Sequence, residues 1–222
     1  MHCRYPGASL RNIFHIGHEY EVFDRDFCTP GTEILLDTRF DDVAPVPPNK
    51  LMSVDTTDIR IKKTGKLAYR SKDYTMCMNV SAGDIEAIRK KGGGKDPLVF
   101  MKNGFRRRPA KFPEPQENEI SYLCDNDLAL RFGLTSGAIN ITHGVWLISR
   151  YFKRGNPFLQ GTCTANLVIL LLTLYRRETF NKFKIYFNNM LYLPNRVVLR
   201  TDDHDFELFD EKGTMVSFGS RE

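Results

Sequence analysis

The sequence predicts a mainly β protein, a β-sandwich or jelly-roll-like barrel with short helical insertions. Three observations favour this fold class. About ten short segments are rich in β-compatible residues, turn signals separate them at intervals of roughly 8–12 residues, and no strands alternate with long helices. The 222 residues, 41% of them hydrophobic, are enough for a substantial core. We therefore expect a single β-rich domain over residues 1–222.

The N-terminal segment 1–30 is expected to be irregular, because proline and glycine punctuate both of its ends. A short strand is predicted at Glu19–Asp24 within this segment. Thr32–Phe40 follows as a predicted buried strand. The next segment, 41–50, contains three prolines and is expected to be a loop, since proline cannot donate a hydrogen bond to a sheet ladder.

Residues 58–91 are expected to supply further strands and one helix. In Asp58–Lys63 apolar and basic residues alternate, which is typical of a half-exposed strand. Strands are also predicted at 66–70 and 74–80. A short helix is predicted over Ile85–Lys91, with Ser81 or Asp84 as its N-cap.

The second half of the chain is denser in apolar residues. Residues 119–132 could hold a strand and a short helix, and residues 138–151 are strand-like before Gly144. Leu167–Leu172 is apolar at every position, which predicts a strand buried on both faces. Shorter strands are expected after it, at 183–187, 191–193, 197–200, 206–209 and 215–218. The last two of these should form a hairpin around Gly213.

Charge is distributed unevenly along the chain, although the formal net charge is only +5. Residues 60–111 carry fifteen lysines and arginines against four acidic residues, whereas residues 1–59 and 201–222 are each net acidic. Clustered cations create a positive field that attracts phosphate polyanions by releasing counterions. Oppositely charged segments can also meet, within one molecule or between copies, and plain solvation of each cluster is the third possibility.

We predict that the basic region 60–111 contacts nucleic acid or another polyanion, and that the protein also associates with itself. The acidic C-terminal run should then pair with basic surface on a neighbouring copy. The candidate binding residues are the lysines and arginines of three clusters: Lys62, Lys63, Lys66, Arg89, Lys90, Lys91, Lys95, Arg106, Arg107, Arg108 and Lys111.

Residues 102–115 form a predicted internal basic arm. Its prolines disfavour a helix, and Phe105 and Phe112 flank three consecutive arginines. The aromatic rings could stack on exposed bases or anchor the arm to the core. Three consecutive arginines cannot share one face of a strand, so the arm is expected to be exposed or bound to a partner rich in acceptors. Phosphate suits the guanidinium fork best.

The cysteines and histidines offer weak candidates for a metal site. The five cysteines are scattered, odd in number and without C-x-x-C spacing, so we expect free thiols. His15 and His18 form an i, i+3 pair that could supply zinc ligands together with Cys3 or Cys28. No second pair has matching spacing, and we therefore predict no metal site and no cofactor.

A catalytic thiol is the other chemical possibility. His143 could form a thiol–imidazole dyad with Cys124 or Cys163. A lone internal histidine is more often a hydrogen-bonded core residue, and neither a nucleophile elbow nor an H-E-x-x-H helix is present. We predict no catalytic residues and keep a small Cys/His-dependent hydrolase as an alternative.

Two resemblances point to viral proteins. The many short strands, the frequent phenylalanine and tyrosine and the basic arm resemble small single-domain viral structural proteins, with jelly-roll coat proteins as the nearest architecture. The segment Gly31–Arg39 is similar to a G-T-x-x-x-x-x-D-T/x-R strand of plant-virus movement proteins, which bind single-stranded nucleic acid. Coat proteins of this type often begin with an arginine-rich arm, whereas the basic segment here is internal.

The resulting hypothesis is a non-enzymatic, self-associating structural protein of viral type that contacts a polyanion. A matrix or occlusion protein without a nucleic-acid role is a further alternative. The longest apolar run falls far short of the ~20 residues that span a bilayer, and the first twenty residues lack the apolar core of a secretory signal. We expect no membrane span and no secretion, with the protein in the cytoplasm or nucleus of a host cell or within a virus particle.

Overall fold

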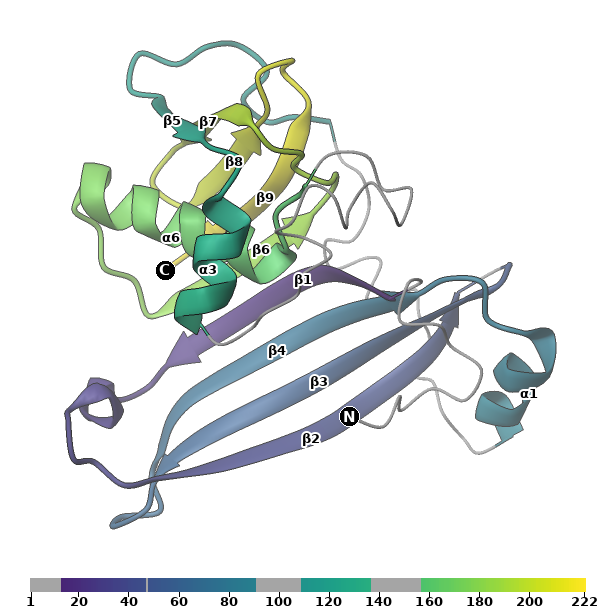
Figure 1. The fold of residues 1–222 in the computed structure, drawn as a ribbon. Helices are drawn as coiled ribbons and strands as arrows, with labels where there is room; N and C mark the ends of the chain where they lie inside the picture. The colour runs from purple at the N-terminus through teal and green to yellow at the C-terminus, as the bar shows by residue number, and fades with distance from the viewer. Residues whose placement is uncertain (1–12, 47, 91–108, 137–156) are drawn as a thin grey trace. The chain divides into compact units, whose positions relative to one another are not determined.

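The computed structural model describes residues 13–46, 48–90, 109–136 and 157–222 (Figure 1). The chain divides into two compact units, one of residues 1–106 with 181–184 and the other of residues 107–180 with 185–222. Strands hold far more of the described residues than helices do, which confirms the mainly β prediction. That these units fold together as one domain stays a prediction.

The first unit is an antiparallel sheet of long strands. Its order is β2-β3-β4-β1, and every one of these neighbouring pairs is antiparallel. A short 3-10 helix, η2, follows the first strand, and the strand β6 begins in this unit and ends in the other. The elements are β1 (Ile13–Val22), η2 (Arg25–Cys28), β2 (Ile34–Val46), β3 (Lys50–Ile61), β4 (Leu67–Cys77) and β6 (Lys182–Phe187).

The strand β2 differs from its prediction at both ends. The proline-rich segment 41–50 is not a loop, because β2 continues to Val46 and Pro45 lies opposite Leu51 of β3. Proline is tolerated there because β2 is the edge strand of this unit, so a missing N–H on the outer side breaks no ladder bond. The strand predicted at 32–40 is present from Ile34 onward, but the prediction that it is buried was wrong, since Leu36 is 64% exposed.

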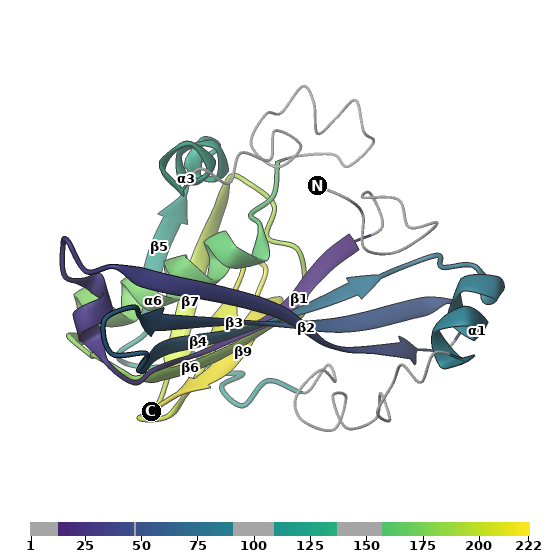
Figure 2. The same cartoon turned by 90° about the horizontal axis from the view of Figure 1, so that it is seen from below.

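The helix α1 (Ala82–Lys90) begins as its capping residues predict. The Ser81 hydroxyl accepts a hydrogen bond from the backbone N–H of Asp84 and donates one to the Asp84 carboxylate. Figure 2 shows the helix at one end of the sheet. There Ile85 packs with a buried apolar cluster that fixes the helix to the strands, made of Val43, Leu51, Cys77 and Val80.

A buried carboxylate organises the charged face of the first unit. The Asp58 side chain is only 3% exposed. Arg70 donates two hydrogen bonds to it, at 2.6 and 2.8 Å, and Arg39 donates a third at 3.0 Å. The bonds from Arg70, opposed by burial and helped by Arg39, hold the pKa of Asp58 well below its usual range. The ionised form of Asp58 therefore stabilises the fold.

The Asp58 contribution should appear as a pH dependence of stability. Because the folded pKa lies below the unfolded value of 3.8, the stabilisation is complete above that pH and is lost as the pH falls toward the folded pKa. We expect Asp58→Asn to lower the free energy of unfolding near pH 7 by about 1–3 kcal/mol. In urea titrations, the difference in free energy of unfolding between the native chain and Asp58→Asn should become smaller as the pH is lowered from 4 to 2.

The exposed Asp203 gives the control, since Asp203→Asn should leave the free energy of unfolding near pH 7 within about 0.5 kcal/mol of the native value. Equal pH profiles for Asp58→Asn and the native chain would contradict the assignment.

The second unit combines short strands with two helices. Its strand order after β6 is β9-β8-β7-β5, and the β5–β7, β7–β8 and β8–β9 pairs are antiparallel. The predicted strands near 183–187, 197–200, 206–209 and 215–218 are confirmed, as is the hairpin at Gly213. The elements are β5 (Ile120–Cys124), α3 (Leu128–Ser136), α6 (Gly161–Arg176), β7 (Asn195–Thr201), β8 (Asp205–Phe209) and β9 (Met215–Arg221).

The most apolar stretch of the chain is a helix, so the prediction of a doubly buried strand at Leu167–Leu172 was wrong. Six apolar residues in a row fit either element, whereas the wider pattern has the helical period. The buried side chains recur three or four positions apart, at Thr164, Leu167, Val168, Leu171 and Leu172.

The strand order also shows that the prediction of a jelly-roll sandwich was wrong. Consecutive strands pair as sheet neighbours, β2 with β3 with β4 and β7 with β8 with β9, whereas a jelly roll needs Greek-key connections. Both views place α6 beside the strands of the second unit, so a helix covers this sheet (Figures 1 and 2).

The two sides of α6 should respond differently to truncation. Leu172 is fully buried, whereas Leu174 is 63% exposed. We expect Leu172→Ala to lower the free energy of unfolding by about 2–5 kcal/mol through lost contacts and a cavity. Leu174→Ala, the same chemical change two residues away, should cost less than about 0.5 kcal/mol. Equal losses in urea titrations would contradict the helical assignment.

Candidate functional site

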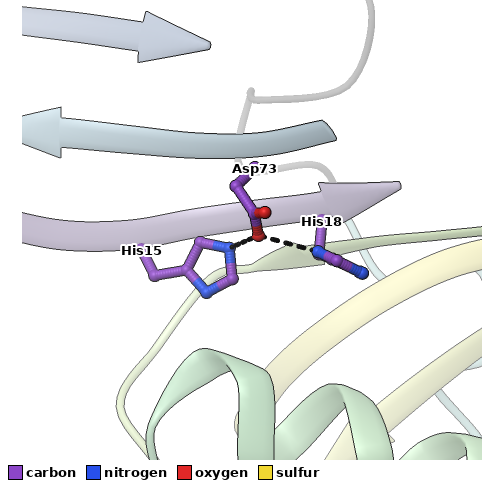
Figure 3. Close-up of side chains that lie close together, drawn as sticks. All are labelled: His15, His18 and Asp73. Atoms are coloured by element: carbon purple, nitrogen blue, oxygen red, sulfur yellow. Dashed lines mark hydrogen bonds and ion pairs between the residues drawn. The ribbon is translucent and has the colours of Figure 1, made fainter. Parts of the chain in front are cut away.

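Two imidazoles meet one carboxylate in the first unit. His15 and His18 lie on β1, and Asp73 lies on the neighbouring β4 (Figure 3). Nδ1 of His18 is 2.8 Å from Oδ1 of Asp73, and Nε2 of His15 is 3.1 Å from the same oxygen. The His15 contact is close enough for an ion pair, although it is poorly aligned for a hydrogen bond.

A β-bulge explains why both histidines face the same carboxylate. Residues three apart on a regular strand point to opposite faces of the sheet. Here His15 lies opposite Thr75 and Gly17 lies opposite Tyr74, so Ile16 is an extra residue without a partner. His18 then lies directly opposite Asp73. The bulge thus makes His15 and His18 equivalent to residues two apart, and they share a face.

The surroundings of Asp73 keep it ionised. Its side chain is 40% exposed, and those of His15 and His18 are 21% and 15% exposed. Burial alone would raise the pKa of Asp73, but the contacts from His15 and His18 outweigh it and hold the pKa well below its usual range. Asp73 is therefore a carboxylate throughout the neutral range.

Aromatic rings continue from the cluster along the same face. Tyr20 follows His18 at the i+2 position, with ring centroids 6.2 Å apart. Tyr20 stacks on Tyr69 at 5.8 Å and on Phe183 at 5.4 Å. Burial and then the neighbouring Tyr69 raise the pKa of Tyr20, so its hydroxyl stays protonated. The cluster is therefore flanked by an aromatic, largely uncharged surface.

This arrangement suits proton transfer. With Nδ1–H of His18 donating to Asp73, the other ring nitrogen, Nε2, carries the lone pair. Figure 3 shows that nitrogen turned away from the carboxylate. Within the described ranges no hydrogen bond to Nε2 of His18 is recorded. An ionised carboxylate behind an imidazole fixes its tautomer and stabilises the imidazolium that forms when it takes a proton.

The same donors could hold a divalent ion. The ligand atoms of His15, His18 and Asp73 all lie within 4.8 Å of one another, and imidazole with carboxylate is a common zinc ligand set. An ion there would occupy the nitrogens that now contact Asp73. Of the cysteines considered as further ligands, Cys28 is not part of the cluster, and Cys3 lies outside the described residues.

The thiols do not provide a nucleophile in the second unit. Cys124 and Cys163 are buried, and burial, with Cys163 a smaller influence on Cys124, raises the pKa of each to about 12. Only the thiolate is nucleophilic, so both sulfurs are unreactive near neutral pH. His143, the other half of the predicted dyad, lies outside the described residues.

The described end of the basic arm is bound within its own unit. The ammonium group of Lys111 lies 2.6 Å from Asp202 and 2.7 Å from Asp205. The buried Glu207 accepts hydrogen bonds from the backbone N–H groups of Lys111 and Phe112, at 2.7 and 2.9 Å. At this end of the arm the acceptors for Lys111 are therefore carboxylates of the same chain.

The other predicted binding residues do not gather into one site in the described part of the chain. Lys62 pairs with Glu33 at 3.3 Å and Lys66 with Asp24 at 2.7 Å. Lys63 and Lys90 are exposed, and Arg89 lies in α1. The remaining candidates lie outside the described residues: Lys91, Lys95, Arg106, Arg107 and Arg108.

The comparisons with known proteins rest on structure alone. No family model and no curated protein matches by sequence. A MaoC-like dehydratase from Phytophthora capsici is similar in structure with a TM-score of 0.68 and 12% identity, over 96% of this chain and 73% of that one. HtdX from Mycobacterium tuberculosis gives 0.66 and 12%, over 96% and 78%. The peroxisomal multifunctional enzyme type 2 from Drosophila melanogaster gives 0.65 and 17%, over 94% of this chain but only 37% of that enzyme.

These comparisons correct the functional prediction. The matched structures are enzymes, not viral coat or movement proteins, so the hypothesis of a non-enzymatic viral structural protein was wrong. Nucleic-acid binding finds no support in them.

No helix in the described ranges is long and apolar enough to cross a membrane. The fold of the chain is that of the hot-dog proteins to which the MaoC-like dehydratases belong.

Proposed function

We propose that this chain is an enzyme that adds water to, or removes water from, an organic substrate by proton transfer at His18, whose imidazole Asp73 orients. The observation that carries the proposal is the pair of imidazoles on one ionised carboxylate, at 2.8 and 3.1 Å. The similarity in fold to MaoC-like dehydratases supports the reaction class.

Removal of water defines what the site must do. A C–H bond and a neighbouring C–O bond break, a carbon–carbon double bond forms, and the hydroxyl leaves as water after taking up a proton. Proton transfer alone suffices only when the C–H bond is acidified by an adjacent carbonyl. A site of imidazoles and a carboxylate therefore fits a β-hydroxy carbonyl compound, and in the reverse direction an α,β-unsaturated carbonyl compound.

Each residue then has a defined role. Nε2 of His18 takes the proton from the carbon next to the carbonyl, and the resulting imidazolium can return a proton to the departing hydroxyl. Asp73 holds Nδ1–H and stabilises the imidazolium, and its low pKa prevents it from taking that proton itself. His15 contacts the same oxygen and helps to hold the carboxylate in place.

A hydrolytic reaction is the second candidate. The small Cys/His-dependent hydrolase, which the sequence analysis kept as an alternative, agrees better with the comparisons than a viral structural protein does. The buried thiols exclude Cys124 and Cys163 as its nucleophiles. The same imidazole could activate water for attack on a carbonyl carbon, which would yield a free acid.

Turnover of an unsaturated thioester tests the proposal. With crotonyl-coenzyme A as probe, the native chain should consume the conjugated double bond, and mass spectrometry should find the hydroxyacyl thioester. His18→Gln should lower kcat by about 10²–10⁴-fold, since it removes the general base. Asp73→Asn should also lower kcat, with a smaller change in KM.

Two comparisons complete this test. His204→Gln changes an exposed histidine of the second unit and should leave turnover unchanged. Activity should survive a chelator, and added Zn²⁺ should inhibit by occupying the imidazoles. Full activity in His18→Gln would contradict the proposal. Release of the free acid would show that the chain catalyses hydrolysis of the thioester and not hydration of its double bond.

A further inference from the structure

The strand β2 leaves an apolar edge uncovered in the described part of the first unit. It ends the strand order of this unit, so one side of its backbone faces no described strand. Four large apolar side chains on it are 40–64% exposed: Ile34, Leu35, Leu36 and Phe40. A long edge strand with exposed apolar side chains is a template for pairing with another chain.

The sequence around Thr38 is self-complementary. Thr38 is flanked by Asp37 and Arg39, and these by Leu36 and Phe40. If two copies of β2 pair antiparallel with Thr38 opposite Thr38, each Asp37 faces the Arg39 of the other copy. Each Leu36 then faces the other Phe40. Opposite charges and aromatic–aliphatic pairs across strands both stabilise a sheet.

We propose that two copies of this chain associate through β2, with a two-fold axis at Thr38. Such an interface is isologous, because the same five residues serve both partners. The pairing would continue the sheet of one copy into that of the other and cover Leu36 and Phe40.

Charges on an edge strand often serve to prevent pairing. That explanation fits charges of one sign, which would repel a second copy. Here the two residues that flank Thr38 carry opposite charges, so the two-fold arrangement turns them into attractive pairs. Arg39 is also held in place by Asp41 and Asp58, through bonds of 3.0 Å each, which reduces the entropy lost when it binds.

The length of the interface follows from the backbone. A β-bulge lies between Phe40 and Asp42 of β2, where the register with β3 shifts by one residue. Bulges end regular pairing. The intermolecular ladder is therefore expected to run over Leu36–Phe40 and to stop at the bulge.

Disulfide trapping tests this register on the full chain. With Cys3 and Cys28 replaced by serine, Thr38→Cys places two cysteines opposite each other on the axis and should give a covalent dimer under mild oxidation. Leu36→Cys alone should not cross-link, because it faces Phe40, whereas a mixture of Leu36→Cys and Phe40→Cys chains should. Thr64→Cys, at an exposed turn, is the matched control.

Sedimentation of the unmodified chain tests the association itself. A dimer should form at tens of micromolar, and Asp37→Lys should shift it to monomer by placing like charges opposite each other. Circular dichroism should show that this exposed substitution leaves the fold intact. A monomeric native chain, or Thr38→Cys cross-linking no better than Thr64→Cys, would overturn the proposal.

Discussion

The β-bulge at Ile16 is the constraint on which the site of the first unit depends. Without the extra residue, His15 and His18 would point to opposite faces of β1 and only one could reach Asp73. With it, both imidazoles contact one oxygen, and their contacts keep that carboxylate ionised despite partial burial. Local backbone irregularity thus produces the electrostatic arrangement from which the proposed chemistry follows.

The sequence predicted individual strands well and their assembly poorly. The capping residue Ser81 and the hairpin at Gly213 are local signals, and both are confirmed. The identity of α6 required a window longer than its six-residue apolar run. The site itself was only half visible, because His15 and His18 stand out as a pair but Asp73 is 55 residues from His18 and joins them only through strand register.

Charge asymmetry along the chain has an internal explanation in the described residues. The acidic C-terminal run meets the described end of the basic arm within the second unit, where Asp202 and Asp205 bind Lys111 and buried Glu207 holds the backbone beside it. A basic segment is therefore not evidence of a polyanion partner until the carboxylates of the same chain that could pair with it have been located. This distinction depends on tertiary structure, which segment charges alone do not provide.

The tautomer of His18 tests the central claim most directly. Long-range ¹H–¹⁵N NMR on histidine-labelled protein near neutral pH distinguishes a proton on Nδ1 from one on Nε2. The account predicts Nδ1–H in the native chain, held by Asp73, and loss of that preference in Asp73→Ala. A native His18 with its proton on Nε2 would contradict the account, because the nitrogen proposed to accept the substrate's proton would already carry one.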